Sequence, residues 1–167
     1  MAFISRLFSD GIHQADLYTL VADINTKLIA LYTQLVADTT VNTATYTANT
    51  PGALPHGISG SGIAQSDIVA WLQRVITGWN ANMALLDADT GVTATNYVAT
   101  HAITDAINPT LGAAYQIRNN GMKQSDMIYW LNTIITEINA VMIHLDADSL
   151  QLSDYASLFS VTDNVDV

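Results

Sequence analysis

The chain has 167 residues, half of them apolar and only 12% charged, with a formal net charge of −10 and no cysteine. Ordinary soluble domains are roughly 25% charged, so a surface this poor in charge suggests that a partner covers part of it. The acidic balance argues against binding nucleic acid or anionic lipid, because both require cationic side chains. The lack of cysteine excludes disulfides and thiolate chemistry, and no run approaches the ~18 apolar residues of a membrane span.

The first ten residues, 1–10, place four apolar side chains at helix-like spacing. We interpret this segment as a short docking segment, and an extra turn of the core is the alternative. The candidate docking residues are Phe3, Ile4, Leu7 and Phe8.

Three segments, 11–38, 62–89 and 121–148, align with one another without a gap. Each opens with Gly, has Gln and Asp at fixed positions after it, and closes with Leu-x-Ala-Asp. A Tyr follows after a short Thr/Ser-rich stretch. Matches at so many equal offsets predict a tandem repeat. The positions that define the repeat are Gln14, Asp16, Asp38 and Tyr46; Gln65, Asp67, Asp89 and Tyr97; and Gln124, Asp126, Asp148 and Tyr155.

Apolar residues within each segment recur at steps of three, four and seven, which predicts one amphipathic helix of about 20 residues per copy. One such helix cannot bury its apolar stripe alone, so we expect the copies to pack on each other. The sequence therefore predicts an all-α fold: three tandem copies of a long amphipathic helix, a turn and a short second helix, packed as a helical bundle. The stripes are Leu17, Leu20, Val21, Ile24, Leu28, Leu31, Tyr32 and Leu35; Ile68, Trp71, Leu72, Val75, Trp79, Met83 and Leu86; and Met127, Trp130, Leu131, Ile134, Ile138, Val141, Met142 and Leu145.

The last Asp of each copy is expected just outside its long helix, because the helix dipole disfavours anions at that end. In the second copy the short helix is expected over residues 95–107, stopped by Pro109. The Tyr of each copy has a polar tip that we expect to reach the capping Asp of its own module.

The predicted organisation follows from these elements. Residues 1–10 form the N-terminal docking segment, 11–48 repeat 1, 49–61 a Pro/Gly loop and 62–108 repeat 2. Residues 109–120 form a connector, 121–159 repeat 3 and 160–167 an acidic tail that is mobile or partner-bound.

We interpret the side chains that could act in catalysis or metal binding as structural residues. The Asp-rich turns resemble the start of a calcium loop but lack its later ligands, so we interpret them as turn and capping residues. No histidine has metal-ligand spacing with another histidine or with an acid on one helical face, and no nucleophile or phosphate-binding motif is present. We expect no enzyme activity, no catalytic residues and no cofactor. The calcium candidates are Asp87, Asp89, Asp146 and Asp148.

Residues 79–97 include Leu-Asp-Ala-Asp followed by Gly-Val-Thr-x-Thr-x-Tyr, and this segment resembles one in small bacteriophage structural proteins. Residues 86–89, 91–93, Thr95 and Tyr97 carry the resemblance. It implies a virion component of the decoration, head-fibre or connector type, assembled in the host cytoplasm, with capsid, portal or tail subunits as partners. It implies no catalytic residues.

We therefore expect a non-enzymatic assembly subunit that forms homo- or hetero-oligomers through its helical surfaces, without nucleic acid or membrane. Three modules in one chain also suggest a position on a three-fold or six-fold axis. The alternative is a monomeric helical module that binds a peptide or small ligand in a groove.

Overall fold

The computed structural model describes residues 14–38, 44–55, 58–59, 62–89, 92, 96–104, 124–148 and 154–161. The expected docking segment 1–10, with Phe3, Ile4, Leu7 and Phe8, and the connector 109–120 lie outside these residues.

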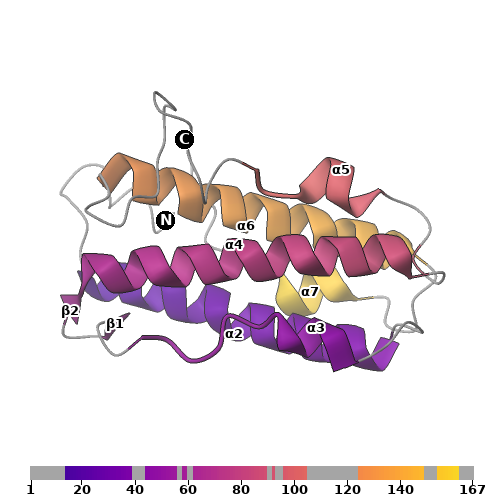
Figure 1. Ribbon diagram of the computed structural model, residues 1–167, viewed down its shortest axis with the longest axis horizontal. Coiled ribbons are helices and arrows are strands. Elements are labelled where there is room, and N and C mark those ends of the chain that lie inside the picture. The colour runs from indigo at the N-terminus through magenta and orange to yellow at the C-terminus, as the bar shows by residue number, and fades with distance from the viewer. Residues whose placement is uncertain are drawn as a thin grey trace.

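Three long helices form the body of the protein: α2 (Gln14–Asp38), α4 (Gln65–Ala88) and α6 (Gln124–Ala147). Each begins at the glutamine of its aligned segment, and α4 and α6 carry Asp67 and Asp126 in their first turns, where the helix dipole favours an anion. The helices have 24 or 25 residues, somewhat more than expected. They lie side by side and run in the same direction (Figure 1).

A short helix of five residues follows each long one: α3 (Ala44–Ala48), α5 (Tyr97–His101) and α7 (Tyr155–Phe159). The expectation that the second of these extends over residues 95–107 is wrong. The helix ends because Ala102 has an extended backbone (ψ 133°). The amide of Ile103 then donates to the Asn80 side chain instead of continuing the helix (2.8 Å).

A two-residue antiparallel pairing interrupts the region expected to be only loop. Strand β1 (Ile58–Ser59) pairs with β2 (Gly62–Ile63), with Ile58 opposite Ile63. Both strands contact α2, so this hairpin holds the chain against the first long helix before α4 begins.

We call each long helix together with the short helix after it a module: α2 and α3 form module 1, α4 and α5 module 2, and α6 and α7 module 3. Each short helix packs on its own long helix and also on the long helix of another module. Helix α3 contacts α4, α5 contacts α6, and α7 contacts α2. The modules therefore follow one another in a closed ring, and we call these three contacts the seams.

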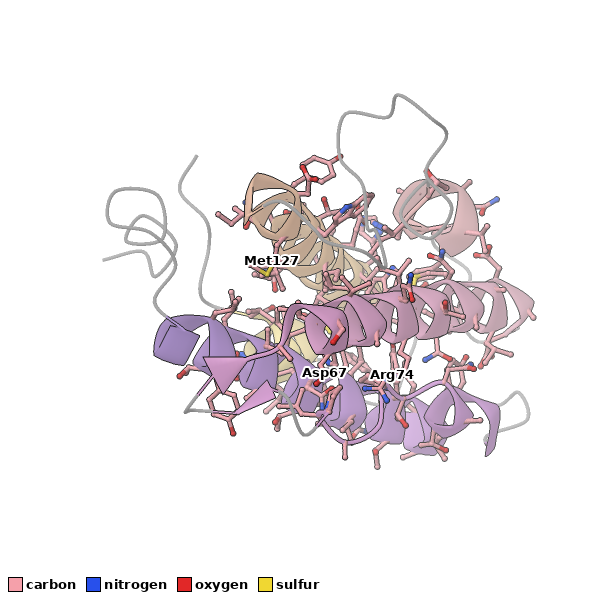
Figure 2. The ribbon with its side chains drawn as sticks, turned by 60° about the vertical axis from the view of Figure 1, so that its left-hand side comes forward. Asp67, Arg74 and Met127 are labelled. Atoms are coloured by element: carbon pink, nitrogen blue, oxygen red, sulfur yellow. The ribbon has the colours of Figure 1, made fainter. Side chains whose placement is uncertain are left out.

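The apolar stripes face one another inside the ring and form a single core. Every stripe residue expected from the sequence is buried except Met127, which is partly buried at the start of α6 (Figure 2). The tryptophans Trp71, Trp79 and Trp130 belong to this core. The all-α class and the helical bundle are thereby confirmed, whereas the tandem repeat stays a prediction.

No described helix is both long enough and apolar enough to cross a membrane.

Asn25 is a buried polar residue that ties three parts of the core together. Its side chain is 6% exposed. The carbonyl oxygen accepts the indole N–H of Trp71 on α4 (2.9 Å), and its amide nitrogen donates to the Gly52 carbonyl beyond α3 (3.1 Å). A buried polar group costs free energy unless it is paired, so this amide and the indole depend on each other.

Replacing Asn25 with Ala leaves the Trp71 N–H and the Gly52 carbonyl without that partner. We expect the free energy of unfolding to fall by about 2 to 3 kcal/mol, the cost of two buried groups left unpaired. Denaturant unfolding monitored by tryptophan fluorescence measures this change. Thr26→Ala is the control, because Thr26 is exposed and its hydroxyl bonds only within its own helix. Equal losses in the two variants would contradict the role of Asn25.

Candidate functional site: the seams between modules

Tyrosine–aspartate hydrogen bonds cross two of the three seams. The Tyr97 hydroxyl of module 2 donates to Asp148 of module 3 (2.6 Å). The Tyr155 hydroxyl of module 3 donates to Asp38 of module 1 (2.6 Å). Both tyrosine side chains are fully buried. The second bond joins the last module to the first across 117 residues of chain and closes the ring.

The sequence-based expectation that each Tyr reaches the Asp of its own module is therefore wrong for Tyr97 and Tyr155. The reason lies in the start of each short helix. Asp87 accepts the backbone N–H groups of Tyr97 (2.6 Å) and Val98 (3.0 Å), and so fixes α5 with the Tyr97 ring directed at the next module.

Asp146 makes the same arrangement in module 3, where it accepts the N–H groups of Tyr155 and Ala156. A carboxylate on the first N–H groups of a helix satisfies donors that have no partner within the helix and complements the helix dipole. Module 1 has Val36 at the equivalent position. The capping role thus falls to the first Asp of Leu-Asp-Ala-Asp, whereas the sequence-based interpretation gave it to the last.

Burial raises the pKa of Tyr97 and of Tyr155, because an ionised phenol loses its hydration in the core. The carboxylates of Asp148 and Asp38 raise the two pKa values further, because each accepts the hydroxyl proton and repels a second negative charge. Tyr46, the buried tyrosine of module 1, adds to the shift of both. The three equivalent tyrosines therefore lie within electrostatic reach of one another.

The seams differ at one equivalent position of the long helices, where module 1 has Lys27, module 2 Gly78 and module 3 Glu137. Lys27 donates to the Ser160 carbonyl just after α7. Gly78 allows the Asn49 backbone to approach, since a Cβ there would lie 2.1 Å from the Asn49 carbonyl oxygen. The three long helices therefore contact the neighbouring module through different residues at this position.

Glu137 pairs with a buried histidine at the second seam, between α5 and α6. Its Oε2 lies 2.9 Å from Nδ1 of His101, the last residue of α5. Nε2 of His101 lies 2.9 Å from Nδ1 of His144, seven residues after Glu137 on α6. This cluster was not predicted from the sequence, because His101 lies on another module. The available signal was that Glu137 and His144 share one face of a helix.

Two asparagines hold the chain that leaves the short helices. Asn80 donates to the Ile103 carbonyl (2.9 Å) and accepts its N–H (2.8 Å), and Asn139 does the same for Val161 (3.0 and 2.8 Å). Val161 is buried. Ser160 and Val161, the described residues of the expected acidic tail 160–167, therefore lie against the protein. The rest of that tail, expected to be mobile or partner-bound, lies outside the described residues.

The repeat-defining positions have separate roles. Gln14, Gln65 and Gln124 are the first residues of the long helices, and Asp16 lies in the first turn of α2. Asp89 ends α4 with an extended backbone and is 3% exposed. Asp38, by contrast, is the last residue of α2 and lies inside the helix, where the sequence placed it just outside.

The Asp-rich turns serve hydrogen bonding in this structure. Asp87 and Asp146 accept helix N–H groups, and Asp148 accepts a tyrosine hydroxyl. Among the described residues, Asp89 included, no three His, Cys, Asp or Glu side chains are placed so that they could hold a metal ion together.

A cleft of about 760 Å³ lies beside the first seam, between the chain after α3 and the first half of α4. Asp67 and Arg74 contribute to its wall from one side of α4 (Figure 2). The guanidinium of Arg74 donates to the Ala53 carbonyl at 3.4 Å.

Comparison of the chain with models of protein families, with curated proteins and with solved structures found no match.

Replacing Tyr97 with Phe removes the hydroxyl from Asp148. We expect a loss of about 1.5 to 3 kcal/mol at neutral pH, as for a hydrogen bond to a charged group. Because the folded pKa of Tyr97 is raised, the unfolded chain releases this proton first as the pH rises. The contribution to stability is therefore complete below the ordinary value of 10.0 and is lost above it.

Urea unfolding from neutral pH to above about pH 10 measures this dependence. The decline at high pH should be smaller in Tyr97→Phe than in the wild type. Tyr129→Phe is the control, because the Tyr129 side chain is 40% exposed. An alkaline decline of the same size in the wild type and in Tyr97→Phe would contradict the assignment.

Gly78→Ala should destabilise the protein although alanine favours a helix by about 1 kcal/mol over glycine. The added Cβ meets the Asn49 carbonyl oxygen, so the first seam must open. We expect a net loss of about 2 kcal/mol or more by thermal unfolding. Thr77→Ala, next to it and exposed, should change stability by less than about 0.5 kcal/mol. A stabilised Gly78→Ala variant would show that the contact is not tight.

Proposed function

We propose that the chain is a non-enzymatic structural subunit of a bacteriophage particle and binds other virion subunits through the outer faces of its long helices. The outer surface carries this proposal. On α2, the Asp23 side chain is 38% exposed and pairs with Lys27 (3.6 Å). The other exposed side chains described on α2 and α6 are uncharged. They are Thr19, Thr26, Ile29, Ala30, Thr33 and Ala37 on α2, and Tyr129, Thr136, Ile143 and Ala147 on α6.

The face of α6 is the best candidate for the contact. Tyr129, Thr136 and Ile143 recur every seven residues, so they lie along one line of the helix. Ile143 is 62% exposed and Tyr129 is 40% exposed. Aromatic and aliphatic side chains at the centre of an uncharged patch are typical of protein–protein contacts.

The interior supports a structural role as well. The described carboxylates and histidines of the seams, including Asp87, Asp146, Asp148 and His101, bond to partners within the chain. The resemblance of residues 79–97 to phage structural proteins supplies the virion context. The closed ring of three modules suits a position on a three-fold or six-fold axis of a particle.

A binding module for a peptide or small ligand is the second candidate, favoured by the cleft beside Asp67 and Arg74. Such a protein would remain a monomer and would gain thermal stability only when its ligand is present.

The test is association with particles. Phage particles from the source culture, separated on a density gradient, are probed with an antibody against the purified chain. We expect the chain in the particle band. Recovery only in the soluble fractions would contradict the proposal, and a ligand-dependent rise in the melting temperature of that monomer would support the second candidate.

A variant pair tests the proposed face. Ile143→Lys places a charge on the exposed line of α6 and should leave the melting temperature unchanged while reducing incorporation into particles. Ala84→Lys places the same charge on an exposed position of α4 and is the matched control. Equal incorporation of both variants would exclude the α6 face as the contact.

A further inference from the structure

We propose that Glu137, His101 and His144 form a pH-sensitive latch that tightens the contact between modules 2 and 3 at neutral pH and loosens it on acidification. This inference concerns the second seam alone, between α5 and α6, and is independent of the virion assignment.

The geometry allows only one proton between the two histidine rings. Nε2 of His101 and Nδ1 of His144 are 2.9 Å apart, so one nitrogen donates and the other accepts. Nδ1 of His101 faces Oε2 of Glu137 at 2.9 Å and donates to it. His101 is 4% exposed, so both of its ring nitrogens depend on these partners.

Protonation of both rings breaks the latch. Two N–H groups then face each other across the same gap, the hydrogen bond is lost, and two positive charges lie side by side with the single carboxylate of Glu137. In the unfolded chain the rings are apart and each takes its own proton. The clash between the two charged rings exists only while the seam is closed, so acidification favours its opening.

Two acids of the packed elements, Asp87 and Asp148, bond to α5 outside this cluster. Asp87 of α4 accepts the first N–H groups of α5, and Tyr97, whose ring centroid lies 6.1 Å from that of His101, donates to Asp148 after α6. Glu137 and His144 are thus the groups that meet the His101 ring directly from α6.

The side that opens follows from the other bonds of α5. The Trp79 indole donates to the His101 carbonyl (2.8 Å), and Asn80 holds Ile103 just beyond it. Both belong to α4 of the same module. When the latch is lost, α5 therefore separates from α6 first, and its helical hydrogen bonds are then supported by α4 alone, which lowers their protection against exchange.

The other two seams lack these rings and provide internal controls. The position of His101 is occupied by Thr50 in module 1 and Phe159 in module 3, and the position of His144 by Gln34 and Leu85. Acidification should therefore act on α5 and leave the equivalent helix α7 in place.

The first test is amide hydrogen exchange of the wild-type chain from about pH 7.5 to about pH 5. The ratio of protection in α5 to that in α7 at each pH cancels the intrinsic pH dependence of exchange. We expect this ratio to fall by up to tenfold per pH unit once the additional proton is taken up. A constant ratio over the range would overturn the proposal.

The second test is the variant His144→Gln, which introduces the residue that module 1 has at this position. The amide still hydrogen-bonds His101 but does not titrate. We expect the melting temperature of the wild type to fall on acidification by about 3 °C or more beyond that of the variant. His56→Gln, which removes a histidine elsewhere, should follow the wild type. Parallel profiles for the wild type and His144→Gln would overturn the latch.

Discussion

Three parallel helices that end together create the constraint on which the rest of the structure depends. Their carboxyl ends carry negative partial charge, and each closes with acidic side chains in or next to the last turn. Hydrogen-bond donors from the short helices α5 and α7 stabilise these acidic side chains. Tyrosine hydroxyls reach Asp148 and Asp38, and the first N–H groups of α5 and α7 reach Asp87 and Asp146. Because each tyrosine donor belongs to another module, neutralising the acids also joins the modules.

The seams share this principle but not their side chains. A lysine, a glycine and a glutamate stand at one equivalent position, and each suits only the segment that it meets: the Ser160 carbonyl, the Asn49 backbone and the His101 ring. Lys27 would have no room at the first seam, where even a Cβ collides. Such differences favour one order of the modules within the chain, which identical seams would not do. The exposed side chains described on α2 and α6 are mostly uncharged, in keeping with the proposed role of covering or bridging neighbouring subunits.

The long helices and the core were predictable because they depend on local spacing. Apolar residues at steps of three and four lie on one face of a helix, and that face must be buried. Leu20, Ile24 and Leu131 are accordingly buried, as the pattern predicts. The partners across the seams were not predictable, because they depend on how far each module is rotated against the next. The Tyr97–Asp148 bond and the His101–His144 pair join residues 51 and 43 positions apart. The early end of α5 depends likewise on Asn80, a residue with no local signal for that role.

The closed ring is the central claim, and the bond between Tyr155 and Asp38 tests it most directly because it joins the last module to the first. A double-mutant cycle with Tyr155→Phe and Asp38→Ala measures their coupling in the free energy of unfolding. The structure predicts a coupling of about 1.5 kcal/mol or more, as for a buried hydrogen bond to a carboxylate. Additive effects, with a coupling below about 0.3 kcal/mol, would mean that module 3 does not close on module 1.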